Sequence, residues 1–135
     1  MNTLSVRARI EQDPEDNKPY LRFKITIDGE PLVDLERYGL AIDYIELAST
    51  INEDGEFYIV TCTCRVAMCA GIKEGIRVFR DNKNIHWIIR WYWGPTRALA
   101  FEREAYAHAI EQGIREYKKL RTQHPDVDVS PFGMS

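Results

Sequence analysis

The stretch I-H-W-I-I-R-W-Y-W (85–93) decides the fold, because it alternates like a β-strand and holds all three tryptophans of the chain. The residues of one face are large and apolar: Ile85, Trp87, Ile89, Trp91 and Trp93. The residues of the other face are mixed: His86, Ile88, Arg90 and Tyr92. We predict a strand with the core on its first face. The second face is too aromatic for an ordinary solvated surface, so we expect a helix, a loop or a partner to cover it.

The segments on either side extend this strand into a meander that ends in a helix. Residues 75–80 predict a short strand, and D-N-K-N (81–84) predicts the hairpin turn. After the break at Gly94-Pro95, residues 97–101 predict one more strand. Residues 102–123 have an apolar stripe at helical spacing, with acids near the start and bases near the end, and they predict a long helix.

The first half of the chain predicts two amphipathic strands, a short helix and a third strand. Residues 4–11 and 20–28 both alternate, and a polar loop with two prolines joins them. Residues 40–51 favour a short helix with Asp43 near its start, and residues 57–64 favour a strand. The fold class predicted is α+β, with one antiparallel sheet of about five to six strands packed against a short helix and a long C-terminal helix. We expect one domain over residues 1–123 and a loosely ordered tail over 124–135.

Composition predicts an ordinary globular protein of the cytoplasm. The chain has 135 residues, of which 44% are hydrophobic and 29% charged. No run approaches the roughly 20 apolar residues of a membrane span, and the N-terminus lacks the pattern of a signal peptide. Three cysteines and no glycosylation sequon fit a reducing compartment.

Charge is unevenly distributed along the sequence. The net charge of −3 argues against a dedicated nucleic-acid binder. Residues 1–60 hold 13 acids and 6 bases, and residues 61–135 hold 8 acids and 12 bases, so the halves carry −7 and +4. An acidic half can steer a basic partner, although solvated loops and turns explain the same imbalance.

The stretch T-C-T-C-R-V-A-M-C-A-G (61–71) contains every cysteine of the chain. A zinc site would use Cys62, Cys64 and Cys69, with His86 as the fourth ligand, but the usual paired C-x2-C spacing is missing. A redox site would need a thiolate of lowered pKa, for which Arg65 is the nearby cation. The third interpretation, which we favour, is close packing of small buried side chains.

The run F-Y-I-V-T-C-T-C-R-V-A-M-C-A-G-I-K-E-G-I-R-V, the later I-H-W and the helix start F-E-R-E-A-Y together resemble a family of small, uncharacterised bacterial proteins with a C-x-C-x4-C-A-G-I core motif. The resemblance covers residues 40–120. Arg65 stands where that family has glycine. The resemblance implies a bacterial cytosolic domain and brings no assigned activity or cofactor.

Catalytic motifs are missing from the sequence. It contains no G-x-S-x-G, no phosphate-binding glycine loop and no H-E-x-x-H, and His108 lies with Glu104 and Glu111 on the polar face of the predicted helix. We therefore predict a non-enzymatic protein-binding module, of the kind that immunity proteins and antitoxins represent, which neutralises a partner. The alternative is a small metal- or thiol-dependent protein that uses Cys62, Cys64, Cys69 and His86.

The predicted partner is another protein, with a basic toxin domain as the first candidate. No cofactor, nucleic acid or membrane is expected as a ligand, and a homodimer is compatible with the sequence. The candidate contact residues are acids of the first half, together with an arginine and a tyrosine of the tryptophan strand: Asp13, Glu15, Asp16, Asp34, Glu36, Arg90 and Tyr92.

Overall fold

The computed structural model describes residues 1–12, 17–33, 40–62, 75–91 and 94–129. The described elements follow one another along the chain as β1 (Leu4–Gln12), β2 (Pro19–Ile27), β3 (Glu30–Pro31), β4 (Leu40–Ile42), α2 (Tyr44–Ser49), β5 (Gly55–Phe57), β6 (Val60–Cys62), β7 (Ile76–Arg80), β8 (Asn84–Ile89), β9 (Arg97–Glu102), α3 (Arg103–Gln123) and β10 (Asp128–Val129). This content confirms the α+β class.

The strands form three separate sheets rather than the single sheet expected. The first has the order β1-β2-β10, with β3 also paired to β2; the second is β4-β6; and the third has the order β5-β7-β8-β9. The pairs are antiparallel except for β10, which lies parallel to β2 at Tyr20 and Leu21. Strand β10 follows α3 and lies within the segment predicted as a tail. The chain beyond α3 therefore returns to the first sheet.

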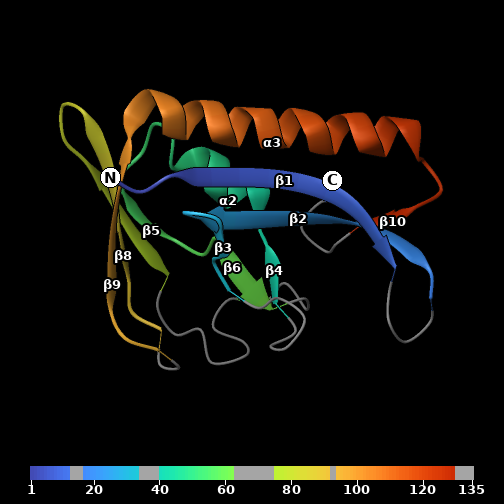
Figure 1. Cartoon of the computed structure of the whole chain (residues 1–135), viewed down its shortest axis with the longest axis horizontal. Coiled ribbons are helices and arrows are strands. Elements are labelled where there is room, and N and C mark those ends of the chain that lie inside the picture. Colours follow the sequence, from blue (N-terminus) through green and yellow to red (C-terminus); the bar gives the residue numbers. More distant parts are fainter. Residues whose placement is uncertain (13–16, 34–39, 63–74, 92–93, 130–135) are drawn as a thin grey trace.

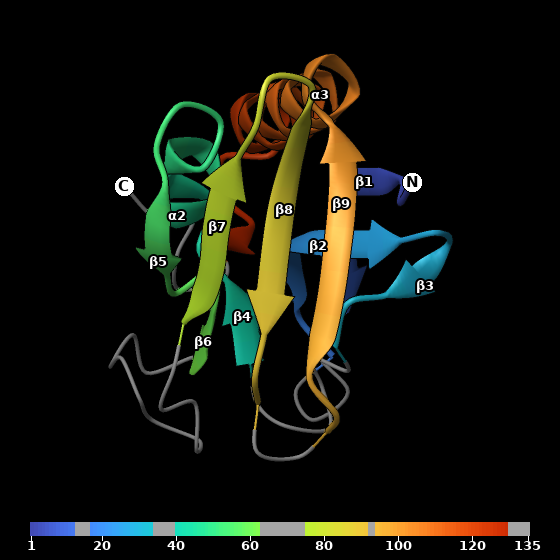
Figure 2. The same cartoon turned by 90° about the vertical axis from the view of Figure 1, so that its left-hand side faces the viewer.

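The first and third sheets run crosswise to each other (Figures 1 and 2). Helix α3 lies along β1, and its N-terminal end sits at one end of the third sheet (Figure 1). The N-terminus links the two sheets directly, since the amide of Asn2 donates to the Ala100 carbonyl oxygen at 2.8 Å. The strands of both sheets alternate between buried and exposed residues, so each sheet buries one of its faces. The two sheets pack against different elements.

The core-facing side of the tryptophan strand is confirmed for β8, which ends at Ile89 rather than at Trp93, and Trp93 lies outside the described residues. Ile85, Trp87 and Ile89 are almost fully buried, and Trp87 makes edge-to-face ring contacts with Phe101 and Tyr106. On its second face His86 and Ile88 are half-buried, and the His86 ring stacks on Phe79 of β7. Neighbouring side chains of the same sheet thus cover part of that face.

A buried polar joint fixes the first half of α3. The Trp87 indole donates to the Tyr106 hydroxyl at 3.0 Å, and the Tyr106 hydroxyl is hydrogen-bonded to the Thr50 hydroxyl. Burial raises the pKa of Tyr106 to about 12. The joint satisfies the polar atoms of two large aromatic side chains inside the core.

Capping side chains set where both helices begin. The Asp43 carboxylate accepts from the amides of Ile45 and Glu46, which confirms its predicted place at the start of a short helix. Residues 40–42, predicted as part of that helix, form β4 instead. Glu102 caps α3 in the same way, through the amides of Glu104 and Ala105.

Candidate functional site

The alternation of β1 and β2 gathers basic side chains on one face of the first sheet. Leu4, Val6 and Ala8 of β1 point into the core, so Arg7 and Arg9 lie on the opposite face. Arg7 pairs in register with Lys24 and Arg9 with Arg22. Four of the six basic residues within 1–60 therefore share one face. The net charge of −7 for residues 1–60 does not reveal this cluster of positive charge.

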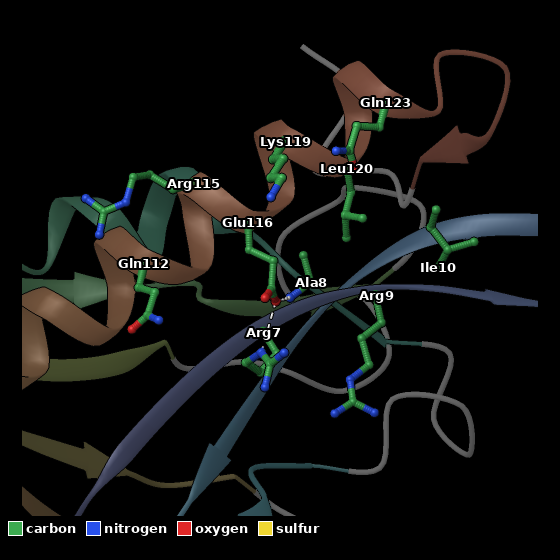
Figure 3. A pocket seen from close by; sticks show the side chains of 10 residues that line it. All are labelled: Arg7, Ala8, Arg9, Ile10, Gln112, Arg115, Glu116, Lys119, Leu120 and Gln123. Atoms are coloured by element: carbon green, nitrogen blue, oxygen red, sulfur yellow. Dashed lines mark hydrogen bonds and ion pairs between the residues drawn. The ribbon is translucent and has the colours of Figure 1, made fainter.

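Helix α3 approaches β1 closely and forms the second wall of a groove. The two elements come close together at Gly113, where a Cβ atom would lie 2.7 Å from Val6 Cβ and 2.8 Å from the Val6 carbonyl oxygen. From there the helix presents a row of side chains at helical spacing toward β1. The groove has a volume of about 770 Å³ and is lined by Arg7, Ala8, Arg9, Ile10, Gln112, Arg115, Glu116, Lys119, Leu120 and Gln123 (Figure 3).

A smaller hollow of about 460 Å³ extends the concave surface along the N-terminal half of β1. It shares Arg7, Gln112 and Glu116 with the groove and adds His108 from the preceding turns of α3. The concave surface between β1 and α3 thus follows the strand over most of its length.

The charge of the groove is strongly unbalanced. Four cations, Arg7, Arg9, Arg115 and Lys119, stand against one carboxylate, that of Glu116. Glu116 pairs with Arg7, and no described residue places a carboxylate within ion-pair distance of the other three cations. The remaining lining includes the apolar side chains of Ala8, Ile10 and Leu120. The groove therefore combines an apolar surface with three cations that no carboxylate of the described ranges pairs with.

The Glu116 carboxylate bridges the helix to the edge of the sheet. Its Oε1 accepts from Arg7 Nε at 3.0 Å and from the Ala8 amide at 2.8 Å (Figure 3). The hydrogen bond from Arg7, assisted by the Ala8 amide and the charges of Arg7 and Arg9, holds the pKa of Glu116 below its usual value. The same pair raises the pKa of Arg7. Both groups are charged at neutral pH.

The basic residues of β2 differ from most of those in the groove because both of them pair with one carboxylate. Glu11 forms ion pairs with Lys24 and, at 3.7 Å, with Arg22. The Arg22 guanidinium also lies over the Tyr20 ring, 5.3 Å from its centroid. Arg9 lies on the same face of the sheet but on the edge strand, and like Arg115 and Lys119 it lines the groove without a carboxylate partner among the described residues.

The predicted partner-binding residues are not brought together by the described structure. Arg90 follows β8 directly and is exposed. The other six candidates lie outside the described residues: Asp13, Glu15, Asp16, Asp34, Glu36 and Tyr92. The prediction that these residues bind a partner stays a prediction.

The predicted metal and thiol residues are likewise only partly described. The backbone of Cys62 pairs with Leu40 in the β4-β6 sheet, and Cys64 and Cys69 lie outside the described residues. His86 Nε2 lies 2.8 Å from Asp81 Oδ2, and this hydrogen bond lowers the pKa of Asp81 to about 2. Within the described ranges, no group of three His, Cys, Asp or Glu side chains could hold a metal ion.

Sequence reasoning missed the groove because its cations come from opposite ends of the chain. Arg7 and Arg9 alternate on a strand, and Arg115 and Lys119 are four residues apart on a helix, so each pair was visible as two cations on one face. Nothing in the sequence alone shows that these two faces meet.

Among the described helices, none is both long and apolar enough to cross a membrane.

Comparison of the chain with models of known protein families, with curated proteins and with solved structures found no significant match.

Proposed function

We propose that this chain is a non-catalytic protein-binding module whose groove between β1 and α3 takes an acidic segment of a partner protein. One observation carries the proposal: Arg9, Arg115 and Lys119 line a groove without a described carboxylate partner. Cations kept apart from acids on a concave surface attract an anionic ligand and speed its association.

The lining favours a protein segment over a nucleic acid. None of the ten lining residues is aromatic, although stacking on aromatic rings is the usual means of holding unpaired bases. The apolar side chains of Ile10 and Leu120 suit a segment in which acidic and apolar residues alternate. The net charge of −3 also disfavours a long polyanion on the rest of the surface.

The groove supports binding rather than catalysis. The ten residues that line it include no serine, cysteine or histidine that could serve as a nucleophile or a general base. Ser5 and His108 line the adjoining hollow, where no hydrogen bond between described residues joins them. Its single carboxylate, Glu116, is held ionised by Arg7 and the Ala8 amide. These side chains can position charge, but they form no pair of a nucleophile and its activating base.

A neutralising role in the bacterial cytoplasm, as in immunity proteins and antitoxins, fits a small binding module of this kind. In that role an acidic and apolar segment of the target would lie in the groove. A basic toxin domain would need a different, acidic surface, and the acids predicted to bind it, Asp13, Glu15, Asp16, Asp34 and Glu36, lie outside the described residues.

The test uses a short fluorescent peptide of alternating glutamate and leucine, acetylated and amidated so that only its side chains carry charge. The variant Arg9→Gln/Lys119→Gln removes two groove cations. The matched control, Arg77→Gln/Lys118→Gln, removes two exposed cations of a strand and of the same helix that do not line the groove. Fluorescence anisotropy measures the affinity of each protein for the peptide.

We expect the groove variant to weaken peptide binding by about tenfold or more and the control by less than about twofold, because only close charge pairs contribute strongly. Equal losses in both variants would show attraction by net charge alone. Absence of binding to the wild-type protein, or tighter binding of a single-stranded oligonucleotide of matched charge, would contradict the proposal.

A further inference from the structure

The carboxylate of Glu116 stands where a ligand carboxylate would be expected. It contacts two donors of different kinds, a guanidinium nitrogen of Arg7 and a backbone amide of the strand edge at Ala8. Both donors meet the same oxygen, Oε1, at 3.0 and 2.8 Å. A guanidinium beside a free backbone amide is a strong arrangement for holding any carboxylate.

We propose that the Arg7 guanidinium and the Ala8 amide form a carboxylate-binding subsite, which Glu116 occupies in the free protein and an aspartate or glutamate of the partner takes over in the complex. This inference rests on the proposed function and adds the point at which the acidic segment is anchored.

The position of β1 in its sheet explains why the Ala8 amide is open to a side chain. Strand β1 pairs only with β2 among the described strands, so its second edge carries amides that no strand satisfies. The Ala8 amide points to that edge and bonds to Glu116 instead. Its partner is therefore a side chain from another element, which can be exchanged without breaking the sheet.

Because the ion pair is exposed, replacing the Glu116 carboxylate by a ligand carboxylate costs little free energy. The side chains of Arg7 and Glu116 are 54% and 31% exposed, so water screens their attraction. A ligand carboxylate would restore both hydrogen bonds, and Glu116 would return to solvent one helical turn beyond the contact of Gly113 with Val6. Arg9, Arg115 and Lys119, which have no carboxylate partner in the described part of the chain, would then hold the remaining acids of the segment.

The test compares Glu116→Gln with Glu111→Gln, which removes the same charge from an exposed position of α3 outside the groove. Removing the internal competitor should strengthen binding of the glutamate–leucine peptide by about fivefold for Glu116→Gln and by less than about twofold for Glu111→Gln. Nuclear magnetic resonance of the unmodified protein supplies a second measurement, in which the Ala8 amide and the Arg7 Nε–H should shift as the peptide is added.

The outcomes separate this subsite from the groove as a whole. If the peptide binds through Arg9 and Lys119 but leaves the Ala8 amide unshifted, and both Gln variants behave alike, the subsite is wrong and the proposed function stands. If the peptide binds without any dependence on Arg9 and Lys119, or does not bind, both proposals are wrong. If Glu116→Gln weakens binding while Glu111→Gln does not, Glu116 is a wall of the groove rather than a competitor.

Discussion

The two ends of α3 are joined to the rest of the chain by opposite kinds of polar contact. Near its start, the Tyr106 hydroxyl is buried and bonded to Trp87 and Thr50. In its second half, toward the C-terminal end, the Glu116 carboxylate meets Arg7 and Ala8 at an open surface. Water cannot replace a partner in the first set, but it competes continuously in the second. The difference suggests that the first end holds the helix in place and the second is free to exchange its partners.

The largest expected effect concerns the close approach between these two ends. In Gly113→Ala, the new Cβ would collide with Val6 Cβ and with the Val6 carbonyl oxygen, and backbone cannot move aside cheaply. We expect the free energy of unfolding to fall by about 2–4 kcal/mol in chemical denaturation. Helix propensity alone would predict a gain of about 1 kcal/mol, so a stabilised variant would contradict the close approach.

The buried joint should be the next most sensitive. Tyr106→Phe keeps the ring but leaves the Trp87 indole N–H without its acceptor. The expected loss is about 1–3 kcal/mol of unfolding free energy, the cost of a buried unsatisfied donor. The control is Tyr44→Phe, whose ring contacts with Phe23 and Tyr117 are kept. Equal, small losses in both variants would mean that the joint contributes little.

The open end should respond in affinity and not in stability. The variant Arg9→Gln/Lys119→Gln touches no described ion pair, so its unfolding free energy should stay within about 0.5 kcal/mol of the wild-type value. Thermal unfolding beside the peptide titration measures both properties on one sample. A large loss of stability would show that these cations hold the fold, and it would remove the contrast between the two ends.

The smallest effect is expected at Asp81, on the turn between β7 and β8. The hydrogen bond from His86, followed by those from the Lys83 and Asn84 amides, lowers the pKa of Asp81 from 3.8 to about 2. A lowered carboxyl pKa stabilises the fold above pH 3.8, and the contribution is lost as pH falls toward 2. A carboxyl-carbon titration by nuclear magnetic resonance should show a midpoint near 2, which His86→Ala should raise. An unchanged midpoint in that variant would contradict the role of His86.

The sequence predicted elements much better than it predicted their arrangement. The helix over 103–123 and the strands around Arg7, Lys24 and Trp87 followed from periods of 3.6 and 2, which record the side of each element that is buried. The period does not record what lies against that side. The division into three sheets was therefore not visible, and the short apolar run at 40–42 was assigned to a helix because it satisfies either pattern.

The candidate site shows the same limit more sharply. Each pair of groove cations can be recognised in the sequence as two cations on one face of an element: Arg7 with Arg9 on a strand, and Arg115 with Lys119 on a helix. Their meeting depends on Gly113, where the missing side chain lets the helix approach Val6. A glycine inside a predicted helix indicates a close contact but does not name its partner.

The packing of the first strand against the last helix also sets the order of events during synthesis on the ribosome. The hairpin of β1 and β2 can pair as soon as residue 27 is available, because its register is local. Its apolar face, with Val6 and Ala8, lacks the cover of α3 until the segment around Gly113 and Tyr117 emerges. At about 5–20 residues per second the nascent hairpin waits roughly 5–18 seconds. During that interval the hairpin exposes an apolar face, and such transiently exposed surface is prone to aggregation.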